Sequence, residues 1–360
     1  MTSKILLEDM EYIHEKIHGH EKFRDGVVLV TGCAGFLGRY ILEYLTRYAR
    51  PLGIRKIIGL DTFLLDRPTW LERLAAESDI LDIQTFDISI GDIAALPHAA
   101  EITHVVHAAS IASPTFYRQY PIETIHANIW GLRRLFDACR DNQRLRGFLF
   151  FSSSEIYGDP MPEAIPTSEE YPGNVSCTGP RACYDESKRL GETMSWVYAK
   201  QWGLPVTVAR PFNNYGPGMR IGDKRLPADL AKCIIENRDI VLLSDGTPTR
   251  TFCYVADAVV GYLLALLHGK YDYFNIGIDR PEIMVRSLAD IFAQAGNDIF
   301  GYTGEVVYGE SDDAAYLTHN PNRRCPVIDK AKQVLNYQPN ILVEEGVGRY
   351  LRFLKQETTL

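Results

Sequence analysis

Three glycines between a predicted strand and a predicted helix constrain the fold of this chain more than any other feature. Gly32, Gly35 and Gly38 stand three residues apart, directly after an apolar run, in the segment Thr-Gly-Cys-Ala-Gly-Phe-Leu-Gly. Glycine permits a sharp turn and a close approach of the backbone to a pyrophosphate, and the amino end of the next helix adds N–H donors and a positive dipole. This context predicts a dinucleotide-binding turn, including Phe36 and Leu37, rather than a purely structural one.

Two acidic positions after the next predicted strands extend this prediction. Asp61 stands 23 residues after Gly38, at the end of the second strand, where its carboxylate can accept hydrogen bonds from both hydroxyls of an adenosine ribose. It would repel a 2′-phosphate, so it favours NAD over NADP. Asp87 and Ile88 follow the third strand, and we expect them beside the adenine. A plain turn or cap residue is an equally good interpretation of Asp87.

Strands and helices alternate along the first two hundred residues. The strand candidates are 27–31, 56–60, 83–86, 104–107, 148–151 and 206–209, and the clearest helical patterns are 37–47, 122–140 and 184–201. This alternation predicts an α/β fold with a doubly wound parallel (Rossmann) sheet. After Arg210 glycine and proline break the pattern, and we expect a smaller mixed α/β lobe at the carboxyl ends of the strands.

The predicted organisation has three parts. A helical extension covers residues 1–24, a dinucleotide-binding domain covers 25–212 with 251–275 returning to it, and a substrate lobe covers 213–250 and 276–360. The extension has apolar residues at helical spacing, which predicts an accessory helix lying either on the main domain or on a partner. These residues are Leu6, Leu7, Met10, Ile13 and Ile17.

Composition excludes several classes of function. The formal net charge of −8 argues against a nucleic-acid-binding surface. No apolar run is long enough to span a bilayer, and the first residues lack an apolar signal core, so we expect no membrane association. The seven scattered cysteines show no metal-ligand spacing, so we expect no metal site, and reduced, buried thiols in a cytoplasmic protein.

Tyr184 and Lys188 stand four residues apart and therefore share one face of the predicted helix 184–201. A neighbouring ammonium and a positive nicotinamide ring would pull the pKa of a phenol toward neutrality, as a general base requires. Lys188 can also bind the nicotinamide ribose. The pair is a candidate catalytic site that also contacts the cofactor.

Taken with the glycine loop, Asp61 and Ser153, this pair resembles the extended short-chain dehydrogenase/reductase family over nearly all of residues 26–350. The resemblance implies that Ser153, Tyr184 and Lys188 act on a sugar hydroxyl whose hydrogen leaves as hydride to NAD. It also implies a cofactor loop at Ala108, Ala109 and Ser110, and a nucleotide sugar as substrate. Finally, it implies a homodimer formed through the helices 122–140 and 184–201, to which the apolar stripe of the extension adds.

Glu155 and the residues around it indicate which members of the family the chain resembles most. The segments 153–160, Ser-Ser-Glu-Ile-Tyr-Gly-Asp-Pro, and 180–186, Pro-Arg-Ala-Cys-Tyr-Asp-Glu, are similar to those of UDP-glucuronate decarboxylases, also called UDP-xylose synthases. The similarity implies oxidation at C4 of the sugar, loss of carbon dioxide and re-reduction. Glu155 would assist at C5, and Ser154 would contact the substrate. The alternatives are a nucleotide-sugar 4-epimerase or 4,6-dehydratase, and more remotely a non-catalytic dinucleotide sensor.

Several basic residues complete the expected substrate site. Arg324-Cys-Pro-Val-Ile aligns with the family segment Arg-Lys-Pro-Asp-Ile, which implies that Arg324 binds the substrate carboxylate. Arg323 is the alternative for this role, and a diphosphate ligand is the alternative function of Arg324. The loop 311–322 before them is longer than that of the family. The resemblance further places Asn213, Arg225 and Arg250 at the diphosphate.

Overall fold

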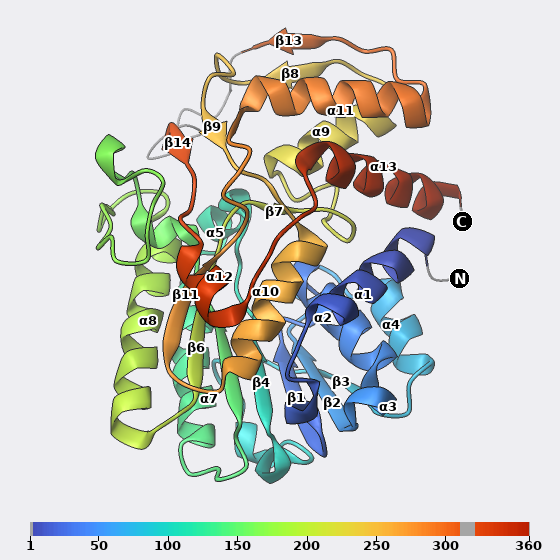
Figure 1. Ribbon diagram of the computed structural model, residues 1–360. Helices are drawn as coiled ribbons and strands as arrows, with labels where there is room; N and C mark the ends of the chain where they lie inside the picture. The colour runs from blue at the N-terminus through green and yellow to red at the C-terminus, as the bar shows by residue number, and fades with distance from the viewer. Residues whose placement is uncertain (1–2, 310–320, 360) are drawn as a thin grey trace.

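Seven parallel strands form the main sheet of this computed structural model, which describes residues 3–309 and 321–359 (Figure 1). Their order across the sheet is β11-β6-β5-β4-β1-β2-β3. The strands are β1 (Gly26–Thr31), β2 (Ile54–Asp61), β3 (Leu81–Thr85), β4 (His104–His107), β5 (Gly147–Phe151), β6 (Val206–Pro211) and β11 (Asp272–Ile276). The predicted doubly wound sheet is confirmed, and each of the predicted strands overlaps one of these.

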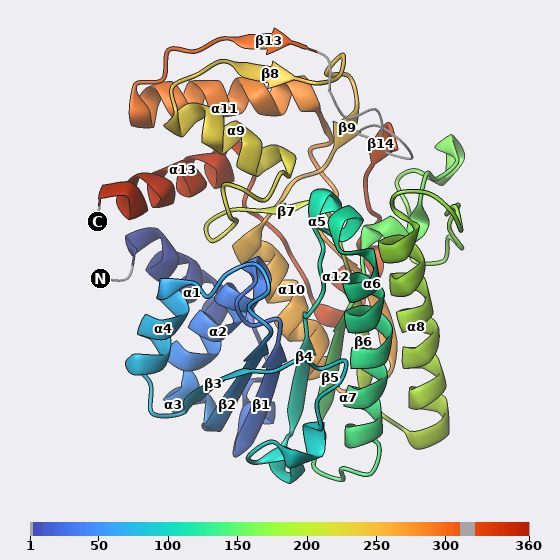
Figure 2. The ribbon, with the colours of Figure 1, turned by 180° about the vertical axis from the view of Figure 1, so that it is seen from behind.

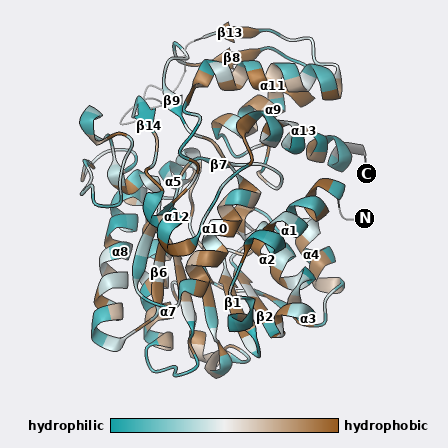
Figure 3. Cartoon of the chain, viewed as in Figure 1, coloured by the Kyte–Doolittle hydropathy of each residue, from teal (hydrophilic) through white to brown (hydrophobic). Residues whose placement is uncertain are grey.

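Helices cover both faces of the sheet because alternate strand residues point to opposite sides. Val28 and Val30 of β1 pack with α2 and α10 on one face, whereas Val27 and Leu29 pack with α7 and α8 on the other (Figures 1 and 2). The hydrophobic colouring is concentrated in the sheet and α10 (Figure 3). The covering helices are α2 (Phe36–Arg47), α10 (Val255–His268), α7 (Leu132–Cys139) and α8 (Ala182–Trp202).

Short elements occupy the connections of this domain. They are η1 (His20–Phe23), α3 (Ala49–Leu52), α4 (Thr69–Ala76), η2 (Ile93–Ala95), η3 (Ala99–Glu101), α5 (Pro114–Gln119), η5 (Ser154–Tyr157) and η6 (Pro162–Ala164). Because parallel strands end at the same edge of a sheet, the loops after β1, β4 and β5 converge there.

The predicted helix 122–140 contains one wider turn. Helix α6 (Pro121–Ile125) continues into the π-helical turn η4 (His126–Gly131) and then into α7. Asn128 on this turn is fully buried, and its Nδ2 donates to Oγ of Ser187 on α8 at 2.8 Å. Such turns are frequent at functional sites. Here the turn attaches the helix to α8 near Tyr184.

The seventh strand, β11, was not among the strands expected from the sequence. It pairs with β6 at one edge of the sheet and contains the buried polar residue Asn275. The amide of Asn275 donates to the carbonyls of Thr167 and Val327 at 3.0 Å and accepts from the hydroxyl of Tyr157 at 2.7 Å. These contacts come from distant segments, so a local hydrophobic pattern does not reveal the strand.

The smaller lobe lies over the carboxyl ends of the strands (Figure 1). Two parallel strands and three helices form most of it, namely β8 (Ile240–Leu242), β13 (Val306–Tyr308), α9 (Leu226–Ile235), α11 (Val285–Phe300) and α13 (Val343–Thr359). Short pairings join it to the main domain. They involve β7 (Asn214–Tyr215), β9 (Thr249–Arg250), β10 (Cys253–Tyr254), β12 (Ile283–Met284) and β14 (Arg323–Arg324), and α12 (Asp329–Leu335) follows. The predicted mixed α/β lobe is therefore present.

The N-terminal helix α1 (Lys4–Lys16) packs against α10, α2 and α13 of its own chain. The carboxylate of Asp9 is completely buried and accepts hydrogen bonds from the hydroxyls of Tyr40 and Tyr254 at 2.7 Å and from Arg349 at 2.9 Å. Leu6, Met10, Ile13 and Ile17 are all buried in the core. The expectation that this stripe adds to a dimer interface is therefore wrong, because it is used within the chain.

Two buried histidines of β4 predict a loss of stability in acid. His104 and His107 are each 1% exposed, and burial lowers the pKa of each to about 3. Histidine in an unfolded chain has a pKa near 6.5, so below that pH these two residues bind protons in the unfolded chain and stay neutral in the folded one. Each of these histidines should therefore lower the free energy of unfolding by up to about 2 kcal/mol when the pH falls from 7.5 to 5.

Urea unfolding at the two pH values measures this effect. His107→Asn should lose less stability on acidification than the parent chain. His126→Asn, at an exposed position, is the control and should match the parent. An identical loss in the His107 variant would show that other groups cause the acid sensitivity.

Candidate active site

A cavity of about 970 Å³ lies between the carboxyl ends of the strands and the smaller lobe. Its lining comes from the glycine loop after β1, the loops after β2, β3, β4 and β5, the start of α8, and the lobe. In a doubly wound sheet, ligands bind where the strand order reverses, which here is between β1 and β4. The cavity therefore occupies the position that the fold predicts.

The glycine loop forms a cradle that side chains would fill. Gly32 has φ +69°, and a Cβ there would lie 2.6 Å from the backbone nitrogen of Ala109. A Cβ on Gly38 would lie 2.5 Å from the carbonyl oxygen of Gly32. Gly35, Phe36 and Leu37 also line the cavity, at the amino end of α2. This arrangement fits the pyrophosphate of a dinucleotide.

The two aspartates after β2 and β3 both line the cavity. The Asp61 carboxylate accepts hydrogen bonds from the backbone N–H groups of Ala34 and Phe63, each at 2.9 Å, so it also shapes the glycine loop. Asp87 accepts from N and Oγ of Ser89 at 2.8 and 2.7 Å, as a turn cap does. Their contacts with ribose and adenine, and that of the neighbouring Ile88, stay predictions.

The loop after β4 faces the glycine loop across the cavity. Ala108, Ala109 and Ser110 all line it. The N–H of Ala109 donates to Oγ1 of Thr31 at 3.3 Å. Ser110 Oγ is buried, and within the described part of the chain it has no hydrogen-bond partner. A bound polar group would satisfy this atom, which fits a cofactor at this position.

Ser153, Tyr184 and Lys188 all line the cavity. The spacing of Tyr184 and Lys188 predicted their shared helix face, and the family resemblance placed Ser153 with them. Ser153 hydrogen-bonds the Tyr184 side chain, and the ammonium of Lys188 lies 5.7 Å from the centroid of the Tyr184 ring. Lys188 Nζ donates to the carbonyl oxygen of Phe151 at 2.8 Å. The Tyr184 ring stacks on that of Tyr117, with centroids 5.1 Å apart.

The pKa of Tyr184 differs from the expectation for a general base. Burial raises it to about 12, although the hydrogen bond with Ser153 opposes the rise. Burial also lowers the pKa of Lys188 to about 7. In the chain alone, burial is therefore the largest influence on the pKa of both groups. The expected pull toward neutrality depends on the positive charge of the nicotinamide, which the protein alone does not supply.

Glu155 also lines the cavity and lies among arginines. Its two carboxylate oxygens accept from Nη1 and Nη2 of Arg324, the second at 2.9 Å, and one of them also accepts from Nη2 of Arg181. Burial disfavours the charge, but Arg324 and Arg181 outweigh it and lower the pKa of Glu155 to about 2. Glu155 is therefore ionised and paired.

Asp185 stands behind this cluster. Its Oδ2 lies 3.6 Å from Nε of Arg181, and its Oδ1 is buried without a hydrogen-bond partner among the described residues. Burial, reinforced by the charge of Glu155, raises the pKa of Asp185 to about 7. The two carboxyl groups thus share Arg181, and Asp185 holds its proton far more readily than an ordinary aspartate does.

The structure distinguishes the two adjacent arginines of β14. The Arg324 side chain is 9% exposed and lines the cavity. The Arg323 side chain is 45% exposed and pairs with Glu282 at 2.7 and 2.8 Å. Of these two adjacent arginines, Arg324 is therefore the one that reaches Glu155. Most of the loop 311–322, expected to be longer than its counterpart in the family, lies outside the described residues.

The other predicted substrate residues, Ser154, Asn213, Arg225 and Arg250, also line the cavity. Arg225 pairs with Asp223, and Asn213 donates to the carbonyl of Thr251 at 2.9 Å. Arg250 donates to the carbonyl of Thr249 at 2.7 Å. Burial and the nearby Arg324 lower the pKa of Arg250 to about 10, which shows that this wall is crowded with positive charge.

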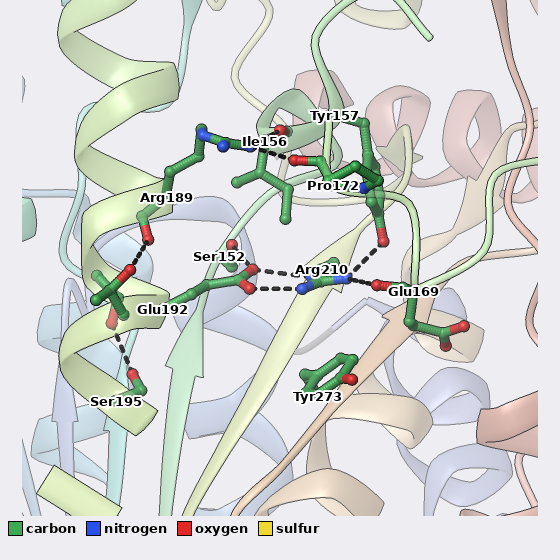
Figure 4. A network of polar contacts seen from close by, with 12 residues as sticks. Ser152, Ile156, Tyr157, Glu169, Pro172, Arg189, Glu192, Ser195, Arg210 and Tyr273 are labelled. Atoms are coloured by element: carbon green, nitrogen blue, oxygen red, sulfur yellow. Dashed lines mark hydrogen bonds and ion pairs between the residues drawn. The ribbon is translucent and has the colours of Figure 1, made fainter. Parts of the chain in front are cut away.

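A buried network supports the loop that carries Ser153 and Glu155 (Figure 4). Arg210 at the end of β6 binds Glu192 of α8 through two hydrogen bonds of 2.9 and 2.6 Å. Glu192 accepts from Ser152 Oγ at 2.5 Å, and Arg210 donates to the hydroxyl of Tyr157 at 2.8 Å. Both ends of the turn η5 are therefore fixed to α8 and β6.

Sequence reasoning missed three residues of the site. Arg181, Asp185 and Tyr117 were given no role, although Arg181 and Asp185 stand in the quoted segment 180–186. A basic residue three positions before Tyr184, about one helical turn away, is the signal that could have identified Arg181. Tyr117 gave no such signal, and its buried hydroxyl has no partner within residues 3–309 and 321–359.

Two features that the described residues lack bear on function. Over the described residues, no helix is long and apolar enough to cross a membrane. In the same part of the chain, no group of three or more His, Cys, Asp or Glu is arranged to hold a metal ion.

Residues 28–277 match the model of the NAD dependent epimerase/dehydratase family. The chain is 34% identical over 332 residues to UDP-glucuronic acid decarboxylase 1 of Xenopus tropicalis, covering 92% of this chain and 72% of that protein. Two solved structures, each 24% identical and covering 92% of this chain and 99% of the other, share the fold. They are UDP-glucose 4-epimerase of Thermotoga maritima with UDP-glucose (TM-score 0.78) and UDP-glucuronic acid 4-epimerase of Bacillus cereus with UDP-glucuronic acid and NAD (TM-score 0.73).

Proposed function

Because this chain belongs to the NAD dependent epimerase/dehydratase family, we propose that it is an NAD-dependent UDP-glucuronate decarboxylase. The observation that carries the proposal is the pair of guanidinium groups, Arg181 and Arg324, which line the same cavity as Tyr184 and both bind Glu155. Two adjacent guanidinium groups favour a sugar that carries a negative charge over a neutral one. Planar guanidinium groups bind a carboxylate through two parallel hydrogen bonds.

The glycine cradle, Asp61 and the loop after β4 would hold NAD, with Tyr184 and Lys188 at the nicotinamide ribose. When bound, NAD supplies oxidation at C4 of the sugar by taking hydride and later returning it. Tyr184 removes the proton of the C4 hydroxyl, assisted by Ser153. Lys188 holds the ribose and stabilises the phenolate through its positive charge.

Oxidation at C4 makes the substrate a β-keto acid, since its carboxylate is attached to the neighbouring C5. The bond to carbon dioxide then breaks easily because its electrons flow into the new carbonyl as an enolate. Arg324 orients the carboxylate before this step, beside Arg181, which pairs with Glu155. Glu155 assists at C5, where the enolate is protonated. Asn213, Arg225 and Arg250 bind the diphosphate, and Ser154 contacts the sugar.

Product analysis tests the proposal. The purified chain with NAD should release carbon dioxide from UDP-glucuronate and form a UDP-pentose, measured by mass spectrometry over a panel of nucleotide sugars. Inversion at C4 would identify an epimerase, and loss of water from a neutral nucleotide hexose would identify a dehydratase. Absence of carbon dioxide from every nucleotide uronate would reject the decarboxylase.

Asp61 should give the chain a strong preference for NAD over NADP, because its carboxylate would face the 2′-phosphate of NADP. Fluorescence titration of each cofactor measures the preference. Asp61→Ser should reduce the discrimination without abolishing NAD binding, and Asp82→Ser, on the neighbouring strand β3, is the control. Equal affinity of the unaltered chain for both cofactors would remove Asp61 from this role.

We further propose a homodimer formed through the continuous helix α6–η4–α7 and through α8. Four large apolar side chains on these helices are about half exposed, and their burial in a four-helix contact would be favourable. They are Ile122 (58%), Trp130 (51%), Leu190 (48%) and Trp196 (49%). Sedimentation at micromolar concentration should give a dimer mass, and Trp196→Asp should shift it toward the monomer. A monomer mass for the unaltered chain would contradict the proposal.

A cytoplasmic location accords with the state of the cysteines. All seven lie in the described part of the chain, and none of them forms a disulfide. Cys177 is exposed and Cys183 half-buried, so the expectation that all are buried is wrong. Free thiols at the surface are tolerated best in a reducing compartment.

A further inference from the structure

Glu155 and Arg324 are joined through the edge of the guanidinium that a substrate carboxylate would use. Nη1 and Nη2 of Arg324 donate to the two oxygens of Glu155, in the fork-to-fork geometry of an arginine–carboxylate pair. Both side chains line the cavity. The Arg324 side chain is only 9% exposed, so water screens this pair little.

A second carboxylate can bind this edge of Arg324 only after Glu155 has left it. Arg181 offers Glu155 another partner, since its Nη2 already donates to Oε2. Glu155 can therefore release Arg324 without becoming an unpaired buried charge, which would be costly. The surrounding groups favour the exchange, because Arg250 adds positive charge and burial disfavours the charge of Asp185 beside Arg181.

We propose that Glu155 and Arg324 form a substrate-operated latch, in which the carboxylate of a nucleotide uronate takes Arg324 and thereby releases Glu155 toward the sugar. This inference rests on the proposed function and adds a source of specificity to it. A neutral hexose has no group that can displace Glu155, so Glu155 stays paired with Arg324 and does not reach the sugar. Recognition of the uronate and readiness of Glu155 thus become one event.

The paired state of Glu155 explains why release matters. A carboxylate whose two oxygens share three N–H donors is a poor proton acceptor. Freed from Arg324, it regains basicity at the moment when C5 needs proton transfer. The groups facing Glu155 come from three separate segments: Arg181 before α8, Arg324 of β14 and Arg250 of β9, with Asp185 of α8 behind them.

Calorimetric binding to the NAD-loaded Tyr184→Phe protein, which should not turn substrate over, tests the latch. Adding Glu155→Gln removes the competing carboxylate, so the Kd of UDP-glucuronate should fall roughly tenfold or more, as for a charged hydrogen bond. The Kd of UDP-glucose, which has the same nucleotide and no carboxylate, should change less than about threefold. An unchanged or higher Kd for UDP-glucuronate would overturn the latch.

Two additions separate the latch from other effects. Glu155→Asp keeps the charge but withdraws it from Arg324 by one methylene, so it too should tighten uronate binding. If only the Gln variant binds the uronate more tightly, the loss of one negative charge explains the effect, and the latch is overturned. If the Gln variant does not fold, crystal structures of the Tyr184→Phe protein with each ligand test the latch. Glu155 should be separated from Arg324 in the complex with UDP-glucuronate and paired with Arg324 in the complex with UDP-glucose. Pairing in both complexes would overturn the latch.

Failure of the latch is distinguishable from failure of the decarboxylase. Release of carbon dioxide by the unaltered enzyme, with no tightening in the Gln variant, rejects only the latch. Tighter uronate binding in both variants, with no carbon dioxide from the unaltered enzyme, supports the latch and rejects the decarboxylase.

Discussion

Replacing Tyr184 with phenylalanine is expected to lower turnover by roughly 10²-fold or more while leaving the fold and NAD binding in place. The substitution removes one hydroxyl from a buried ring and keeps the stacking on Tyr117. The proton of the substrate hydroxyl then has no acceptor beside Ser153. Initial rates with saturating UDP-glucuronate and NAD, together with thermal unfolding of both proteins, measure the two parts of this prediction.

Tyr198→Phe is the matched control. Tyr198 lies on the same helix, is 9% exposed, and its hydroxyl donates to Asp137 at 2.6 Å, outside the lining of the cavity. It should keep nearly full turnover. Comparable activity in the two variants, both close to the unaltered enzyme, would place the base on another residue.

Arg324→Ala is expected to raise the KM for UDP-glucuronate by roughly 10- to 100-fold, since a charged hydrogen bond to a carboxylate contributes roughly 1.5–3 kcal/mol. Binding of UDP-glucose, which lacks the carboxylate, should change little. Steady-state kinetics with the uronate and calorimetry with the neutral sugar separate the two effects. Arg324→Lys keeps the charge without the planar fork and should recover only part of the loss.

Arg323→Ala is the control for the neighbouring position, because Arg323 is half exposed and its guanidinium pairs with Glu282. It should leave the KM near that of the unaltered enzyme. A larger loss in the Arg323 variant than in the Arg324 variant would transfer the carboxylate role to Arg323.

Local pattern was sufficient for the parts of the molecule that are themselves local. The glycine turn, the alternation of strands and helices, and the Tyr184–Lys188 face each depend on residues close together in the chain. The surroundings of Glu155 do not, since Arg181 and Arg324 stand 26 and 169 positions away. The sequence therefore predicted that Glu155 and Arg324 belong to one site, by resemblance, but not that they bind each other.

The same limit explains the errors at the edges of the fold. Strand β11 is held by Asn275 and its partners in distant loops, so its own pattern is weak. The apolar stripe of the N-terminal helix was correctly identified, but its partner depends on tertiary packing. The burial that raises the pKa of Tyr184 in the chain alone was also not visible, because spacing shows the ammonium of Lys188 and does not show how far the phenol is buried.

The path of the chain between sheet and lobe has a consequence for how such enzymes diversify. The chain leaves the sheet after β6, builds α9 and β8, returns through α10 to β11, and leaves again to form α11 and β13. Neither part is a contiguous module, so recombination cannot exchange a whole substrate lobe in one piece. New sugar specificities in this architecture should therefore arise by point substitution and loop replacement around a retained frame, and library design for altered substrates should follow the same route.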